Sequence, residues 1–425
     1  MNILWVTNSI LPDLAEALNI KHRPFEGWLI NLLQRLSQKD INLTVVTAQK
    51  KMGYHHHKRN GVNYFVLETI KNKAEYDSTL ENQWKKVMKL SQPDLVHIHG
   101  SENAHGLALI NTFPNHKYVL SIQGLILVYS RYYRAGLTSS EIYKNLTIRN
   151  ILKRDSIISE EKWFRKRGNT IEKLYFEKAG NFIGRTSWDK AHTVHMSNGG
   201  NYFHCDEMLR NSFYETSPWE YQKCKPFSIF ISQGNYPIKG MHQVLKAVAL
   251  LKNDFPKIKL SFAGRDILMT NDSFKNRIKQ KNYGKYLSNL VKKLDLSDNI
   301  EYLGMLNEEK MINAYKAANI FICPSSIENS PNSLAEAQIL GVPCISSYVG
   351  GVPDMVEHNK TGLLYRFEEV EQLAEHIRTL FVNTNLAIEI GSNGKKKAVE
   401  RHDKETIVNQ TMNIYQSIIS RTSID

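Results

Sequence analysis

The stretch "CPSSIENSPNSLAEAQILGVPCISS", from Cys323 to Ser347, decides the fold. It starts at the end of a short β-branched run, passes through a polar loop into a helical segment, and ends in a second short β-branched run. This succession of strand, helix and strand is typical of parallel βα units. It also places two carboxylates, Glu328 and Glu336, eight residues apart, beside a helix end that favours anions.

The same alternation extends in both directions along the chain. In the first half the strand candidates are "ILWVTNS", "LTVVTA", "DLVHIHG", "YVLSIQG" and "NFIGRT", with helical stretches such as Gly27 to Ser37 between them. After a polar stretch at 215–225 the pattern restarts with "FSIFISQG", "IKLSFAGR", "NIEYLG", "NIFICPSS" and "VPCISS". We therefore predict an α/β protein of two tandem Rossmann-like, doubly wound domains, closed by a helix from about Lys404 to Ile419.

The amino-acid composition restricts the classes of function that the protein can have. The 425 residues carry a net charge of +13, which favours anionic partners, but no nucleic-acid-binding motif accompanies this charge. The four cysteines lack metal-ligand spacing, so we expect neither a disulfide nor a zinc site. The run from His55 to Gly61, "HHHKRNG", is interpreted as a turn rather than a metal site. The first residues resemble no export signal and no long apolar run follows, so a cytoplasmic protein is expected.

Ligands of open parallel sheets bind at the carboxyl ends of strands, and three polar loops follow strand candidates here. In "SSIENSPNS", Asn332, Ser333 and Leu334 open a helix whose free amides suit a phosphate. Glu336 has a structural alternative, since Ser333 and Glu336 fit a capping box, which leaves Glu328 unexplained.

The other two loops also have alternatives. In "YVGGVPDM", Gly350 and Gly351 either admit a ligand to the backbone or serve turn geometry alone. In "QGNYPIKG", Lys239 either reaches a phosphate or is solvated.

Taken together, the string "SSIENSPNSLAEAQILGVPCISSYVGGVPDMVEHNKTGLLY" resembles the donor-binding core of the family 4 retaining glycosyltransferases of GT-B fold. "YPIKG" resembles the Lys-Gly loop of that family, "LVHIHG" its N-domain strand and histidine, and "FEGW", with Gly27, its first loop. The resemblance implies an acceptor-binding N-terminal domain over residues 1–215 and a donor domain over 216–403. It also implies that residues 404–425 cross back onto the N-terminal domain.

The resemblance further implies roles for single residues. Glu336 is expected to accept the ribose hydroxyls and Glu328 to hold the transferred sugar. Lys239 and the amides near Asn332, Ser333 and Leu334 are expected to stabilise the departing diphosphate without a metal or cofactor. The remaining donor-binding positions are glycines and one amide side chain in these loops: Gly234, Asn235, Gly350, Gly351 and Gly27.

The sequence departs from the family pattern at two places. Gly234 and Asn235 stand where relatives carry an Arg that clamps the diphosphate, with Arg265 a weak substitute. Gln123 stands where many relatives carry a His facing the donor sugar, and an amide cannot titrate near neutrality. His99 remains a candidate catalytic residue, with a structural hydrogen-bonding role as its alternative.

The resemblance implies a hexosyltransferase that moves sugar from a nucleotide-diphosphate donor to a saccharide or lipid-linked acceptor in cell-surface polysaccharide or glycolipid synthesis. A nucleotide-sugar epimerase or a phosphorylase on the same frame, and a catalytically silent nucleotide-sugar binder, stay open as alternatives. Residues 131–167 carry ten Arg or Lys and four Asp or Glu, interleaved with aromatic residues. This segment is either a solvated helical face or a surface that contacts anionic membrane.

Overall fold

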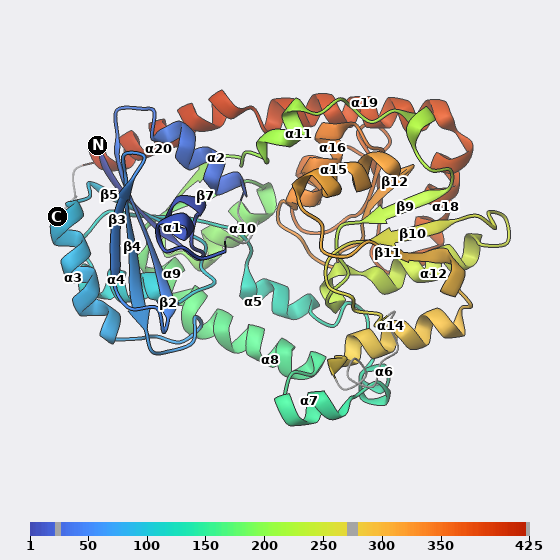
Figure 1. Ribbon diagram of the computed structural model, residues 1–425, viewed down its shortest axis with the longest axis horizontal. Coiled ribbons are helices and arrows are strands. Elements are labelled where there is room, and N and C mark those ends of the chain that lie inside the picture. Colours follow the sequence, from blue (N-terminus) through green and yellow to red (C-terminus); the bar gives the residue numbers. More distant parts are fainter. Residues whose placement is uncertain (22–26, 270–278, 422–425) are drawn as a thin grey trace. The chain divides into compact units, whose positions relative to one another are not determined.

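The computed structural model in Figure 1 describes residues 1–21, 27–269 and 279–421. The chain forms two compact units. Unit 1 comprises Met1–Val128, Arg165–Arg210 and His402–Asp425, and unit 2 comprises Tyr129–Phe164 and Asn211–Arg401. Residues 129–164, which the sequence-based boundaries place in the N-terminal domain, therefore make most of their contacts inside unit 2.

Unit 1 is built on an eight-stranded sheet in the order β3-β4-β2-β1-β5-β6-β7-β8, in which only the β3–β4 pair is antiparallel. The strands are β1 (Asn2–Thr7), β2 (Asn42–Lys50), β3 (His55–Arg59), β4 (Val62–Thr69), β5 (Leu95–His99), β6 (Tyr118–Ser121), β7 (Asn181–Gly184) and β8 (Asn201–His204). The helices are α1 (Pro12–Ala17), α2 (Gly27–Leu36), α3 (Thr79–Ser91), α4 (His105–Thr112), α5 (Ile126–Tyr129), α9 (Lys173–Lys178), α10 (Ser187–Met196) and α20 (Lys404–Ser420). A π-helical turn, Gly168–Glu172, precedes α9.

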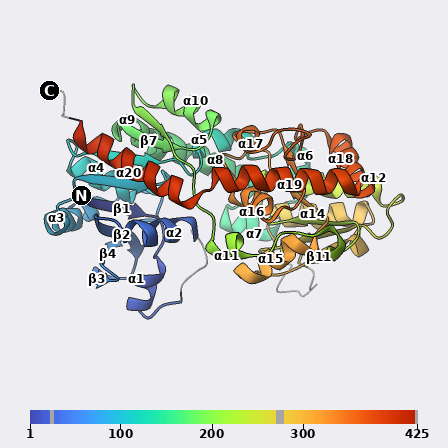
Figure 2. The same cartoon turned by 90° about the horizontal axis from the view of Figure 1, so that it is seen from above.

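Both faces of the unit 1 sheet are covered, which explains why β1 is apolar at successive positions. Leu4 and Val6 pack in one cluster with side chains of α3, α4 and α9. Ile3 and Trp5 pack in the opposite cluster with side chains of α1, α2 and α20. The last helix, α20, thus lies on the same face of this sheet as α2 (Figure 2).

The structure of the histidine run shows that its interpretation as a turn is wrong. His55, His56 and His57 form strand β3 rather than a turn, and β3 pairs antiparallel with β4. The turn lies at Asn60 and Gly61, whose φ angles of 48° and 77° suit a tight hairpin. Alternation along the strand stacks the His56 ring on Phe65, while His55 and His57 share the other face.

Unit 2 is built on a six-stranded parallel sheet in the order β11-β10-β9-β12-β13-β14. Its strands are β9 (Ser228–Ile231), β10 (Lys259–Phe262), β11 (Ile300–Tyr302), β12 (Ile320–Cys323), β13 (Cys344–Ser347) and β14 (Leu363–Tyr365). Its helices include α6 (Ser139–Lys144), α7 (Ile148–Lys153), α11 (Asn211–Glu215), α12 (Met241–Leu251), α14 (Asn282–Lys293), α15 (Glu308–Ala317), α16 (Asn332–Leu340), α17 (Val352–Met355), α18 (Val370–Val382) and α19 (Thr384–Arg401), and α8 (Ile157–Arg167) begins in this unit.

The topology confirms the predicted fold class of two Rossmann-like α/β units. In unit 2, β9, β12 and β13 are neighbours, so the loops that follow them meet at one edge of the sheet. These are the three loops that the sequence singled out. Among the described residues, no helix combines the length and the apolar character needed to cross a bilayer.

Candidate functional site

An ion pair between Lys239 and Glu328 is the centre of the candidate site in unit 2. Lys239 ends the 3₁₀ turn Pro237–Lys239 that follows β9, and Glu328 lies in the loop that follows β12. The Lys239 Nζ is 2.5 Å from Glu328 Oε1. Ser325 Oγ donates to the same carboxylate oxygen at 2.7 Å. The two loops that the sequence selected separately therefore meet through their charged side chains.

Burial and charge act against each other on this pair. The side chains of Lys239 and Glu328 are 15% and 9% exposed, so Lys239 is not the solvated lysine of the alternative interpretation. Burial by itself lowers the pKa of Lys239, but the Glu328 carboxylate outweighs it and holds the pKa above its usual value. Lys239 is consequently a fixed cation beside the start of α16, and both side chains line one pocket with Ser333.

Two glycines allow these loops to approach each other closely. Gly240 has a φ of 67°, and a Cβ built there would lie 1.7 Å from the carbonyl oxygen of Pro324. Gly350 has a φ of 51°, and its Cβ would lie 1.8 Å from the carbonyl oxygen of Glu328. The neighbouring Gly351 N–H donates to that same oxygen at 3.0 Å. Gly350 and Gly351 thus hold the Glu328 loop, which supports the structural alternative for this glycine pair.

The start of α16 corrects the capping-box interpretation. The N-cap residue is Pro331, no side chain caps the helix, and Ser333 lies inside its first turn. The Leu334 N–H donates to the Pro331 carbonyl at 3.0 Å. Of the three amides predicted to bind a diphosphate, that of Leu334 therefore already has an acceptor. The first-turn amides of Asn332 and Ser333 have no acceptor within the helix.

Glu336 is buried in the same helix, at 8% exposure. The hydroxyl of Tyr315, from α15, donates to the Ser333 carbonyl at 2.9 Å and reaches Glu336 Oε2 at 3.4 Å. This carboxylate is therefore oriented by a tertiary contact rather than by local capping.

The loop after β9 places the remaining predicted donor-binding residues. A Cβ on Gly234 would lie 2.6 Å from Met241 Sδ, so close packing against α12 accounts for this glycine. Asn235 has a buried Oδ1 without a hydrogen-bond partner among the described residues. Arg265, the suggested substitute for the missing Arg, is exposed after β10 and does not line the pocket of Lys239 and Glu328.

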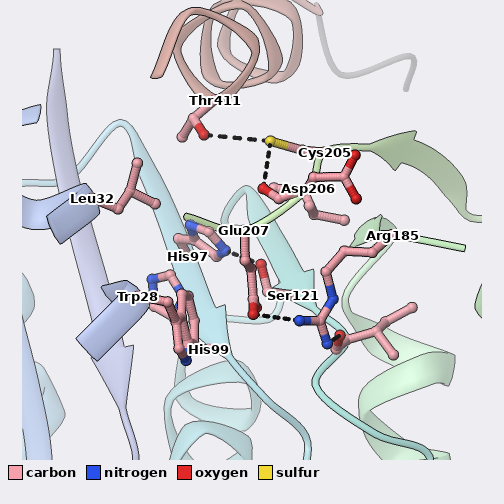
Figure 3. A pocket seen from close by; sticks show the side chains of 12 residues that line it. Trp28, Leu32, His97, His99, Ser121, Arg185, Cys205, Asp206, Glu207 and Thr411 are labelled. Atoms are coloured by element: carbon pink, nitrogen blue, oxygen red, sulfur yellow. Dashed lines mark hydrogen bonds and ion pairs between the residues drawn. The ribbon is translucent and has the colours of Figure 1, made fainter. Parts of the chain in front are cut away.

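A second pocket lies within unit 1 at the carboxyl ends of its strands (Figure 3). Its lining includes Trp28 from α2, His97 and His99 from β5, Ser121 from β6, Arg185 after β7, Glu207 after β8 and Thr411 from α20. The predicted Gly27 is the first residue of α2, where a Cβ would lie 2.6 Å from Arg210 Cγ. Phe25 and Glu26 of the predicted first loop lie outside the described residues.

His99 is 3% exposed, and neither of its ring nitrogens has a hydrogen-bond partner among the described residues. The ring packs against Trp5 and Trp28, with ring centroids 4.5 and 5.8 Å away. Burial, with a smaller effect of His97, holds the pKa of His99 well below its usual value, so the imidazole is neutral. This geometry contradicts the hydrogen-bonding alternative, because both ring nitrogens are buried without a partner among the described residues.

Gln123 belongs to a polar cluster that the sequence did not reveal. Its Nε2 donates to Glu207 Oε1 at 2.7 Å, and Arg185 pairs with the other oxygen of Glu207. Arg185 also donates to the carbonyl oxygens of Ile122 and Gln123, at 3.2 and 3.0 Å. The side chain of Gln123 is thus held by Glu207. Arg185 lies within the strand candidate "NFIGRT" and directly follows the observed strand β7, so the strand-end rule could have identified it.

Among the described residues, no three His, Cys, Asp or Glu side chains gather in a way that could hold a metal ion.

Comparison with known proteins agrees with this architecture. Residues 215–397 match the family model "Glycosyl transferases group 1", and residues 21–161 match "Glycosyl transferase 4-like". Over 130 residues the chain is 28% identical to N-acetyl-alpha-D-glucosaminyl L-malate synthase of Bacillus anthracis, a match that covers 31% of this chain and 34% of that protein. Over 184 residues it is 25% identical to the capsular polysaccharide biosynthesis glycosyltransferase CapM of Staphylococcus aureus, covering 43% of this chain and 44% of that protein.

Similarity to a solved structure extends over nearly the whole chain. The crystal structure of Anabaena Alr3699/HepE in complex with UDP-glucose matches with a TM-score of 0.65 and 17% identity, covering 98% of this chain and 99% of that one. At this identity the match shows the fold alone, whereas the matches to sequence relatives span less than half of their length. With the two family models and the two Rossmann-like units, these findings show that the chain belongs to the group 1 glycosyltransferases of GT-B fold and family 4 type.

Proposed function

We propose that this protein transfers a hexosyl group from a nucleotide-diphosphate sugar to a hydroxyl of a saccharide or lipid-linked acceptor, with retention of configuration and without a metal. The observation that carries this proposal is the buried cation of Lys239, held by Glu328 beside the uncapped start of α16. A diphosphate needs such an arrangement, because its charge grows as the sugar leaves. The UDP-glucose bound by Anabaena Alr3699/HepE makes UDP-sugars the first donors to test.

In this proposal each residue of the unit 2 site has one role. The Lys239 ammonium and the amides of Asn332 and Ser333 bind the diphosphate oxygens. Glu336, already oriented by Tyr315, accepts the ribose hydroxyls. Glu328 receives Lys239 and Ser325 on Oε1, and its second oxygen binds a hydroxyl of the transferred sugar.

The reaction follows from these positions. The bond between the anomeric carbon and the diphosphate oxygen breaks, and the acceptor oxygen bonds to the same face of that carbon. The acceptor proton passes to the departing diphosphate, so no protein base is required. Catalysis then depends on positioning and on stabilisation of the leaving-group charge.

The experiment is an incubation of the purified chain with UDP-, GDP- and ADP-sugars, with and without simple saccharide acceptors and with EDTA present. Nucleotide release that increases with acceptor is expected, and NMR of the product should show the anomeric configuration of the donor. Epimerisation of the donor without release would favour the epimerase alternative. Tight nucleotide binding with neither reaction across all donors and acceptors would favour a silent binder.

A matched pair of variants links the activity to the site. Lys239→Met should abolish nucleotide release, whereas Lys246→Met, a lysine of α12 that does not line the same pocket, should leave it unchanged. Equal release by both variants would remove Lys239 from the reaction.

A further inference from the structure

Helix α7, Ile148–Lys153, presents an apolar face outward from unit 2. The side chains of Ile148, Ile151 and Leu152 are 73%, 69% and 77% exposed, which are the highest fractions among the large hydrophobic residues in the described part of the chain. Their spacing of three and four residues places them on one side of the helix. The position of α7 can be followed in Figure 1.

The opposite side of α7 is polar and packed against the protein. Asn150 is 3% exposed, and its Nδ2 donates to Asp155 Oδ1 at 2.9 Å. Arg149 donates to Asp155 at 3.0 Å and to the Lys279 carbonyl at 3.0 Å. Thr147 caps the helix and also donates to the Gln280 carbonyl at 2.9 Å. Amphipathic surface helices normally bury their apolar side, so α7 has the reverse orientation and is fixed in it.

The segment that carries this face has an excess of positive charge, with ten Arg or Lys and four Asp or Glu over residues 131–167. Lys144, Lys153 and Arg154 are exposed next to it in the sequence. The acidic side chains of the same segment are engaged elsewhere: Asp155 with Arg149, Glu160 with Lys281, Glu161 with Arg134, and Glu141 with the capping residue Thr138. The basic side chains beside the apolar face are therefore not neutralised by these carboxylates.

We propose that this face of α7 docks the protein on an anionic lipid bilayer. Ile148, Ile151 and Leu152 enter the boundary between headgroups and acyl chains, and Lys144, Lys153 and Arg154 bind lipid phosphates. A helix of six residues is only about 9 Å long, and its apolar face is too small for a stable protein interface of about 800 Å² per partner. A second copy would bring the same basic side chains together, which opposes self-association.

Bilayer binding in this form does not depend on the proposed function. The benefit of docking for catalysis does depend on that function. Docking would bring a glycosyltransferase to lipid-linked acceptors, so this benefit rests on the proposed transfer reaction. The two ideas are tested separately, because vesicle binding is measured without donor, and nucleotide release is measured without vesicles.

The experiment is co-sedimentation of the full chain with vesicles of phosphatidylcholine alone, or of equal parts phosphatidylcholine and phosphatidylglycerol, at low salt. The wild type is expected to bind the anionic vesicles at least ten-fold more tightly. The double variant Ile151→Ser with Leu152→Ser, and the double variant Lys153→Glu with Arg154→Glu, should each bind them at least ten-fold more weakly. The control is Leu250→Ser with Val382→Ser, two exposed apolar residues of α12 and α18 in the same unit, which should bind as the wild type does.

Three results would overturn the proposal. The first is a wild type that ignores anionic vesicles or binds both compositions equally. The second is an Ile151 and Leu152 double variant that binds as tightly as the wild type. The third is a wild-type dimer, seen by sedimentation velocity, that this double variant dissociates, since the face would then be an interface between copies. Because all the substituted residues are exposed, thermal unfolding of the variants should match that of the wild type.

Discussion

Lys239 and Glu328 show at the scale of single residues how a charged pair can be kept in a protein interior. Each side chain can be buried because the charge of the other compensates its own charge, and Ser325 adds a hydrogen bond to the carboxylate. Replacing Glu328 by Ala leaves an ammonium without its counter-ion, at a cost of about 3 kcal/mol in the free energy of unfolding. We expect Glu328→Ala and Lys239→Ala each to lower nucleotide release strongly while the protein stays folded.

Urea unfolding and donor turnover check this prediction. The double variant Lys239→Ala with Glu328→Ala should lose less stability than the sum of the two single changes, because no uncompensated charge remains. Wild-type turnover in either single variant, or strictly additive losses of stability, would contradict the assigned pairing.

Gly350 gives a second prediction at this scale. Gly350→Ala combines a positive φ with a Cβ that would lie 1.8 Å from the Glu328 carbonyl oxygen. Gly304 offers a matched control, since its φ is 80° and its Cβ would meet nothing within 4 Å. Both variants should lose about 1 kcal/mol of stability from backbone strain, and Gly350→Ala should lose more, because its Cβ meets the backbone of Glu328. Only Gly350→Ala should also lose affinity for UDP in isothermal titration, and equal affinities would exclude a role for this approach in shaping the site.

At the scale of elements, the π-helical turn Gly168–Glu172 anchors the loop that carries Gln123. A Cβ on Gly168 would lie 2.6 Å from the Leu127 Cα. The Glu172 carboxylate is fully buried and accepts hydrogen bonds from the N–H groups of Ile126 and Leu127 at 2.8 Å, at the start of α5. Ser101, after β5, donates to it at 3.0 Å. One carboxylate thus ties the loops after two strands of unit 1 to α9.

The buried Glu172 predicts that the free energy of unfolding depends on pH. Burial raises the pKa of Glu172 to about 7 from a usual value near 4.5, although the three hydrogen bonds oppose the rise. A carboxyl group whose pKa is raised by folding binds more protons in the native state than in the unfolded state. Its contribution to the free energy of unfolding is therefore present below about pH 4.5 and is lost as the pH rises through 7. The wild type should therefore lose stability relative to Glu172→Gln between pH 5 and 8, by at most about 3 kcal/mol.

Urea unfolding of both proteins at four pH values in this range measures the difference. If the two stability curves run parallel, Glu172 does not titrate there.

At the scale of the whole molecule, the chain divides its predicted site residues between two units that each complete a pocket from their own strands. The proposed function places the nucleotide of the donor in unit 2. UDP or GDP at about 100 times its dissociation constant should therefore stabilise the protein by about 2.7 kcal/mol. Hydrogen exchange should slow at residues 232–240 and 324–334 and stay unchanged in α20. Protection confined to residues 97–99 and 185–207 would move the nucleotide to unit 1.

Much of this architecture can be predicted from the sequence. The βα alternation predicted the fold class, because apolar periods of two and near four residues are local properties. The positions of Lys239 and Glu328 after strands identified two loops that meet in the structure, since parallel strands bring their carboxyl ends to one edge of the sheet. The hairpin at Asn60 and Gly61 was also present in the sequence as an Asn-Gly pair, although the histidine run before it was interpreted as a turn.

The sequence by itself determined the alternation of strands and helices, the family, and the residue types of the loops that carry Lys239 and Glu328. Only the tertiary structure decided their partners: that Lys239 binds Glu328, that Gln123 binds Glu207, that residues 129–164 pack in unit 2, and that α7 turns its apolar side outward. Each of these is a contact or an orientation set by residues distant in the chain. Local periodicity carries no information about them, because the same helix or loop can bury either side depending on what it meets.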